Sequence, residues 1–256
     1  MSIIAVVGDG ATTTAVALTA AWPADQLAVC LEADPRGGVV GAWLDLTRSG
    51  GGLSQAAALP SPTWPQIEPL IQTSPTGIRV LTAPVRAIEA AASIGEVTHR
   101  VVPILSMLHS PVFVADCGRA NLGAGLPAVV AQASIAVVPV LQHQRSARAA
   151  AVHVERLAEL CDALASRAIP IVLAVIGARP YSADEIASFV AGRGEHVATV
   201  DLAVDDWSAA VLAGRTGSSR RLKRAALMRS AAGATALLSA MLVSIQQPAP
   251  VWGAPR

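Results

Sequence analysis

The sequence predicts a doubly wound α/β fold, in which helices cover both faces of a mostly parallel sheet. Short runs rich in valine, isoleucine and leucine recur along the chain, each bounded by glycine, proline or aspartate. These runs are continuous rather than alternating, as expected of strands buried on both faces. Alanine-rich segments of helical composition lie between them, and this alternation implies right-handed βαβ crossovers. In such folds ligands bind at the carboxyl ends of the strands.

Each expected element is placed by its composition. The expected strands are 3–7, 27–31, 78–82, 112–115, 135–140, 171–176 and 197–200. The expected helices are 11–21, 86–109, 122–132, 144–167, 183–192 and a last one over about 222–245. Segment 48–77 is rich in glycine, serine, proline and threonine, and we expect a long surface excursion there. One domain over 1–245 and a disordered proline-rich tail over 246–256 complete the prediction.

Composition narrows the class of protein. With 53% hydrophobic residues, the 256-residue chain can bury the core of a single large domain. Its 19 basic and 18 acidic side chains leave a formal charge of +1, which gives no overall electrostatic case for nucleic acid or an anionic membrane. No uninterrupted apolar run approaches the roughly 20 residues of a membrane span. We therefore expect a cytoplasmic protein whose cysteines are buried thiols.

A glycine-bearing turn follows the first expected strand, in the stretch IIAVVGDGATTTAVALTAAWP at 3–23. Backbone amides of such a turn, with the helix N-terminus behind them, favour a bound phosphate. Thr12 stands where a hydroxyl commonly holds Mg²⁺, but Ala11 stands where a lysine would bridge the phosphates. Asp9 would repel phosphate unless it points outward. An ordinary strand-to-helix turn capped by Thr13 or Thr14 explains the stretch equally well.

Further segments, taken with this turn, resemble the ParA/MinD family of deviant phosphate-loop ATPases. They are LAVCLEADPRGG at 27–38, VFVADCGR at 112–119 and IAVVPVLQHQRSARA at 135–149, and their order and spacing match the family over most of 1–215. The resemblance implies a P-loop NTPase-like fold and ATP or ADP bound with Mg²⁺. It also implies a spatial organiser that positions DNA, a septum, or a secretion or pilus apparatus through dimerisation and a protein partner.

The resemblance also implies roles for particular residues. Thr12 and Asp116 would hold Mg²⁺, the latter through water. Asp34, or less favourably Glu32, would orient the attacking water; a turn capped by Asp34 explains that residue equally well. The residues implied in cofactor binding are Gly8, Asp9, Gly10, Ala11, Thr12, Thr13, Arg119, Arg179 and Asp205. The first six form the loop, while Arg119 and Arg179, like Arg36, follow strand ends and would supply phosphate charge, although each is also explained as a solvated loop arginine. Asp205 lies where the family has its adenine loop, and a helix N-cap accounts for it as well.

The chain departs from the family at both lysines of the loop, which align with Val6 and Ala11. The segments at 32–38 and 115–119, in a chain without these lysines, resemble a lysine-less branch of MinD-like proteins that occurs in Ala/Arg-rich actinobacterial proteomes. Two functions remain open at this point. One is a nucleotide-binding switch with weak or absent hydrolysis, and the other is a pseudo-ATPase scaffold that binds proteins and no nucleotide.

A basic cluster precedes the last expected helix. It consists of Arg220, Arg221, Lys223 and Arg224. A basic stretch beside an amphipathic helix can contact an anionic membrane or DNA. We favour a core-packing helix with a solvated basic entry, because the small alanine, serine and glycine residues of the helix make poor membrane anchors.

Overall fold

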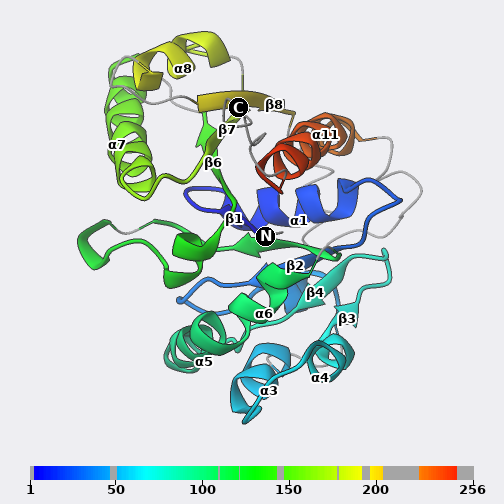
Figure 1. Cartoon of the computed structure of the whole chain (residues 1–256). Coiled ribbons are helices and arrows are strands. Elements are labelled where there is room, and N and C mark those ends of the chain that lie inside the picture. Colours follow the sequence, from blue (N-terminus) through cyan, green and yellow to red (C-terminus); the bar gives the residue numbers. More distant parts are fainter. Residues whose placement is uncertain are drawn as a thin grey trace, which may run out of the picture.

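The computed structural model describes residues 3–46, 51–108, 110–120, 122–142, 147–177, 179–191, 197–203 and 225–246. Its centre is an eight-stranded sheet of order β3-β4-β2-β5-β1-β6-β7-β8 (Figure 1). The strands are β1 Ile3–Val6, β2 Ala28–Glu32, β3 Gln72–Thr73, β4 Arg79–Leu81, β5 Val112–Asp116, β6 Ile135–Leu141, β7 Ile171–Ile176 and β8 Val197–Leu202. Every neighbouring pair is parallel except β3 and β4. The predicted fold class and all the expected strands are confirmed, and β3 was missed.

Helices cover both faces of this sheet (Figure 1). The α-helices are α1 Ala11–Ala21, α2 Val40–Trp43, α3 Gly52–Ala58, α4 Trp64–Ile67, α5 Ala87–Arg100, α6 Val102–Met107, α7 Ala147–Ala165, α8 Ala183–Ala191 and α11 Ala226–Gln246. The 3₁₀ helices are η1 Glu68–Leu70, η2 Leu122–Ala124 and η3 Ala128–Gln132. One face carries α1 and α11, and the other carries α3, α5, α6, α7 and α8.

Two apolar cores result, one on each face, and β1 contributes to both. Ile3 and Ala5 join the core under α5 and α7, whereas Ile4 and Val6 join the core under α1 and α11. All four side chains are fully buried. This division follows from the two-residue period of a strand, and it explains why the strand sequences are apolar without alternation.

The segment expected as a surface excursion is partly core. Over the described part of 48–77 the chain forms α3, α4, η1 and β3, and it buries Leu53, Ala56 and Ile67. Its elements are only 2 to 7 residues long. Each carries too few apolar residues for a period to emerge from the glycine, serine and proline around it, so the prediction of a surface excursion was wrong there.

Two expected helices also differ. The segment 86–109 divides into α5 and α6, which meet at Val101, with Pro103 in the first turn of the second helix. Proline is tolerated in a first helical turn because the amide that it lacks would have no helical partner. The segment 122–132 forms the 3₁₀ helices η2 and η3 instead of an α-helix, with Pro127 between them.

The helix α11 is long and apolar enough to cross a membrane by length and composition alone. In this fold its inner side packs against α1 and β8. Leu227, Ala231 and Leu238 are buried there, and the Thr235 hydroxyl donates to the Ala21 carbonyl at 3.1 Å. The helix therefore closes one core, as the favoured interpretation required. The predicted tail over 246–256 begins one residue too early, because Gln246 still belongs to α11. The rest of that tail and the basic cluster at 220–224 lie outside the described residues.

Removing the Leu238 side chain should destabilise the fold. Leu238 is fully buried in the α11 face, so Leu238→Ala should lower the free energy of unfolding by about 2–5 kcal/mol. The matched control is Leu237→Ala, because Leu237 is 36% exposed on the same helix and should cost less than about 1 kcal/mol. Denaturant unfolding measures both variants. Equal losses would contradict the packing of α11 described above.

Candidate functional site

The loop between β1 and α1 lies at the carboxyl ends of the central strands. Gly8 and Gly10 have φ of +128° and +85°, a region that side-chain-bearing residues rarely occupy. The Gly8 amide donates to the Gly118 carbonyl at 2.9 Å, which ties the loop to the chain after β5. The Ala11 amide donates to the Gly8 carbonyl at 3.2 Å. These bonds fix a tight turn whose helix begins at Ala11.

The first turn of α1 retains free donors. Among the hydrogen bonds of the described residues, none uses the amides of Thr12 or Thr13. No side chain caps the helix, and its first turn contains no acidic residue. The unsatisfied amides and the helix dipole therefore offer a positive end to an anion.

Asp116 ends β5 beside this turn. Its carboxylate is only 2% exposed and accepts from the Gly118 amide at 3.1 Å, and the Thr12 hydroxyl lies near enough to favour its charged form. Burial raises the pKa of Asp116 to about 6, although the Thr12 hydroxyl and the Gly118 amide lower it. A hydroxyl and a carboxylate side by side, next to free amides, are the oxygen ligands and the setting that Mg²⁺ with a phosphate requires.

Asp34 and Arg36 follow β2 and face the same region. Arg36 donates from Nη2 to Asp34 at 2.7 Å and from Nε at 3.0 Å, and its amide also donates to the carboxylate at 2.9 Å. The Asp34 carboxylate lies directly against Gly118, where any Cβ would collide with it. Glycine is therefore required at 118, in addition to its φ of +65°. Sequence reasoning did not single out Gly118, although it stands within the ADCGR stretch.

Glu32 has a different setting. Its carboxylate is 2% exposed and accepts from the Val40 amide at 2.6 Å and from the Ala83 amide at 2.8 Å. Burial raises its pKa to about 7 against the effect of these bonds, and the charge of Asp116 adds to the rise. Glu32 thus joins β2 to α2 and to the end of β4, with both oxygens occupied by backbone amides.

A pocket of about 190 Å³ lies over the loop. Its lining contains the predicted residues Gly8, Asp9, Gly10, Ala11, Thr12, Thr13, Arg36 and Arg119, together with Trp43 and Gly118. Trp43 is on α2 and was missed; its signal was a single tryptophan shortly after the ADPRGG segment. Arg179 follows β7 and does not line this pocket. Asp205 lies outside the described residues.

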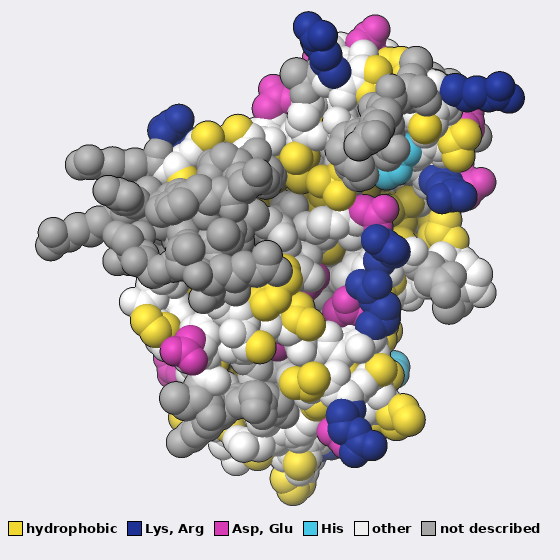
Figure 2. All heavy atoms as spheres, turned by 180° about the vertical axis from the view of Figure 1, so that it is seen from behind, with side chains coloured by type: hydrophobic (Ala, Val, Ile, Leu, Met, Phe, Trp, Pro, Cys, Tyr) yellow, Lys and Arg dark blue, Asp and Glu magenta, His cyan; other side chains and the backbone are white. Residues whose placement is uncertain are grey.

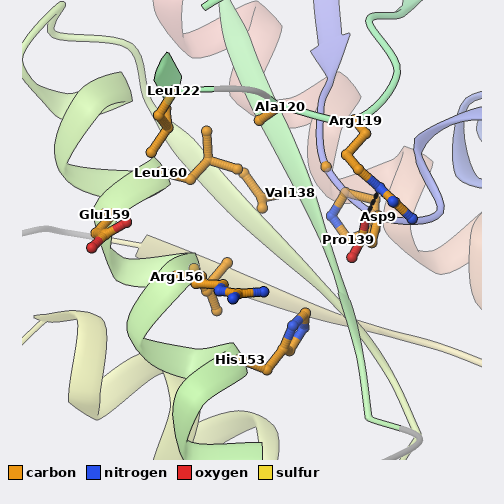
Figure 3. A pocket seen from close by; sticks show the side chains of 12 residues that line it. Asp9, Arg119, Ala120, Leu122, Val138, Pro139, His153, Arg156, Glu159 and Leu160 are labelled. Atoms are coloured by element: carbon orange, nitrogen blue, oxygen red, sulfur yellow. Dashed lines mark ion pairs between the residues drawn. The ribbon is translucent and has the colours of Figure 1, made fainter. Parts of the chain in front are cut away.

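The negative charge of Asp9 in the loop is compensated by an ion pair with Arg119 (Figure 3). The Arg119 side chain is 67% exposed, so the pair lies at the mouth of the pocket. On the face shown in Figure 2, most of the coloured basic side chains have an acidic one close by. The two arginines that line this pocket, Arg36 and Arg119, therefore both have an acidic partner.

Several solved structures are similar to this chain over nearly its whole length. MinD of Pyrococcus horikoshii, described as the septum site-determining protein complexed with Mg-ADP, matches with a TM-score of 0.70 at 12% identity over 96% of this chain and 99% of that one. A ParA family ATPase from Chlorobium tepidum matches with a TM-score of 0.66 at 13% identity, over 93% and 98%. The chain has the fold of the MinD and ParA ATPases.

More distant enzymes share this MinD/ParA-like fold. Cobyrinic acid a,c-diamide synthase of Mycobacterium smegmatis, with a bound ATP analog and magnesium, matches with a TM-score of 0.54 at 14% identity, over 95% of this chain and 97% of that one. No protein-family model matches the sequence. No curated protein matches it either.

Stability should fall as the pH rises from 5 to 8. The pKa of Glu32 is about 7 in the folded chain against an ordinary 4.5, so protonation stabilises the fold, and this contribution is lost as the pH passes 7. Asp116, with a pKa of about 6, adds an effect of the same sign. Glu32→Gln should remove about 3 kcal/mol of this pH dependence. Denaturant unfolding at several pH values measures it.

The control for that experiment is Glu89→Gln, which changes an exposed glutamate of α5 and should leave the pH dependence of stability unchanged. An equally steep dependence in Glu32→Gln would show that the carboxylate of Glu32 is not the titrating group.

Proposed function

We propose that this protein is a MinD/ParA-like nucleotide-binding switch that binds ATP or ADP with Mg²⁺ and hydrolyses ATP slowly or not at all. The observation that carries the proposal is that the Thr12 hydroxyl lies with the buried Asp116 carboxylate beside the free amides of the first turn of α1. A capped structural turn would have no need of a buried carboxylate at this place, because burial disfavours its charge.

The absence of the loop lysine affects nucleotide binding and phosphoryl transfer differently. Amides and a helix dipole are sufficient to hold a phosphate, since they carry the positive partial charge that an anion requires. Arg36 and Arg119 border the same pocket and are the nearest replacements for the lost charge. Both are engaged by acidic partners, Asp34 and Asp9, so they would have to exchange partners to reach a phosphate. Phosphoryl transfer depends on fixed charge, and its loss favours slow hydrolysis.

The acidic residues support the same conclusion. Asp34 is our candidate for orienting the attacking water, but Arg36 occupies both of its oxygens. Glu32 is held by two backbone amides, and we assign it to structure rather than to catalysis. Slow ATP hydrolysis is compatible with a switch, because the ATP-bound state then lasts long enough for a partner to recognise it.

We further propose that the switch is cytoplasmic and acts through a protein partner, as a spatial organiser and as a homodimer. The support is indirect, from the partnership named for one structure of the same fold, the complex of MinC and MinD of Aquifex aeolicus. Contact with DNA or a membrane through the basic cluster at 220–224 stays the less favoured alternative.

The second candidate function, a scaffold without nucleotide, is favoured by the alanine at position 11 and by the ion pairs that Arg36 and Arg119 form.

Calorimetric titration of the full chain with ADP and ATP, with and without Mg²⁺, separates the two candidates. The switch predicts saturable binding that strengthens with Mg²⁺ and weakens about tenfold or more in Asp116→Ala and Thr12→Ala, because Thr12→Ala removes a Mg²⁺ oxygen and Asp116→Ala removes the carboxylate that would hold a Mg²⁺-bound water. The control is Asp184→Ala, which removes an exposed carboxylate on α8. Absence of binding at millimolar nucleotide would overturn the switch and leave the scaffold.

Restoring the lysine gives a second test. Ala11 lines the pocket but is only 2% exposed, so the lysine of Ala11→Lys must extend out of the core to place its ammonium at a phosphate. A charged hydrogen bond of about 1.5–3 kcal/mol there should raise ATP affinity about tenfold or more. Ala11→Met is the matched control, because methionine has a similar length and no charge. If the two variants bind ATP equally, no phosphate lies where the proposal puts it.

A further inference from the structure

A second cavity, of about 360 Å³, lies on the other side of the loop, between the loop and α7 (Figure 3). Its walls come from the loop itself, the chain after β5, the second half of β6 and the middle of α7. This volume falls in the range of about 300–1,000 Å³ that is usual for small-molecule sites. The cavity is therefore large enough for a ligand of several heavy atoms.

One wall of the cavity is apolar. Leu122 of η2, Val138 of β6 and Leu160 of α7 lie close together and form this wall (Figure 3). Val138 and Leu160 belong to the core of this face of the sheet, whereas Leu122 is 37% exposed. An exposed leucine beside such a wall leaves apolar surface that a bound aliphatic group would remove from water.

The opposite wall carries charge. Arg156 and His153 point from α7 into the cavity toward the pair of Asp9 and Arg119, while Glu159 points away (Figure 3). Within the described part of the chain, Arg156 forms no hydrogen bond or ion pair with a protein group. Arg119 is already neutralised by Asp9. Arg156, an exposed residue of α7, therefore has no acidic partner among the described residues, and its guanidinium points into the cavity beside an apolar wall.

We propose that this cavity is a second binding site, for a carboxylate that carries a short aliphatic chain. A planar guanidinium pairs with a carboxylate through two parallel hydrogen bonds, and the single uncompensated charge matches a monoanion better than a phosphate dianion. The aliphatic chain lies on Leu122, Val138 and Leu160. The cavity shares Gly8, Asp9 and Arg119 with the phosphate pocket, but Arg156 does not border that pocket, so carboxylate binding can be tested separately on the nucleotide-free chain.

Titration of the nucleotide-free full chain with butanoate, hexanoate and hexanol tests the site. Hexanoate should bind saturably at one site, with an affinity about two- to fourfold higher per added methylene than butanoate. Hexanol should bind at least tenfold more weakly than hexanoate, because it lacks the carboxylate. Arg156→Gln should weaken hexanoate binding about tenfold or more. Arg148→Gln, an exposed arginine of α7 outside the cavity, should leave it unchanged.

A second variant tests the apolar wall. Leu122→Asn should reduce the gain from butanoate to hexanoate while leaving thermal unfolding near that of the parent, because Leu122 is partly exposed. Circular dichroism confirms that each variant is folded. Absence of saturable hexanoate binding at millimolar concentration, equal binding of hexanol, or equal effects of Arg156→Gln and Arg148→Gln would each overturn the proposal.

Discussion

The close packing of strand ends around Gly118 is the constraint on which the site depends. Its carbonyl accepts from Gly8 and its amide donates to Asp116, while the Asp34 carboxylate lies against its Cα. The phosphate loop, the candidate Mg²⁺ ligand and the acidic residue after β2 thus meet at one backbone position. A side chain there would push these groups apart, because their separation is set by the spacing of adjacent strands.

Charge at the site is arranged in pairs rather than concentrated on one side chain. Arg36 is held by Asp34 and Arg119 by Asp9, and the carboxyl groups of Glu32 and Asp116 accept from backbone amides. A lysine in the loop would present a free charge to a phosphate. Paired arginines instead make anion binding a competition, in which the anion replaces a carboxylate. This arrangement costs affinity and leaves catalysis without its usual fixed charge.

The sequence predicted the sheet well because its strands are buried on both faces, so each one is a continuous apolar run. The family resemblance assigned Thr12 and Asp116 to one site, and the pairing of β1 with β5 brings those two strand ends together. The short helices and the strand within 51–77 were not predicted, because elements of a few residues are too short to show a hydrophobic periodicity. The pairing of Asp9 with Arg119 and the position of Trp43 depend on how distant loops pack, and no local pattern carries that information.

The antiparallel strand β3 has a consequence for how the molecule meets other chains. It forms one edge of the sheet and is only two residues long. An edge this short offers very few free backbone groups, so another chain has little template for adding a strand there. A protein approaching that side would therefore meet mainly the side chains of α4, η1 and the neighbouring loops, and these can change without disturbing the sheet.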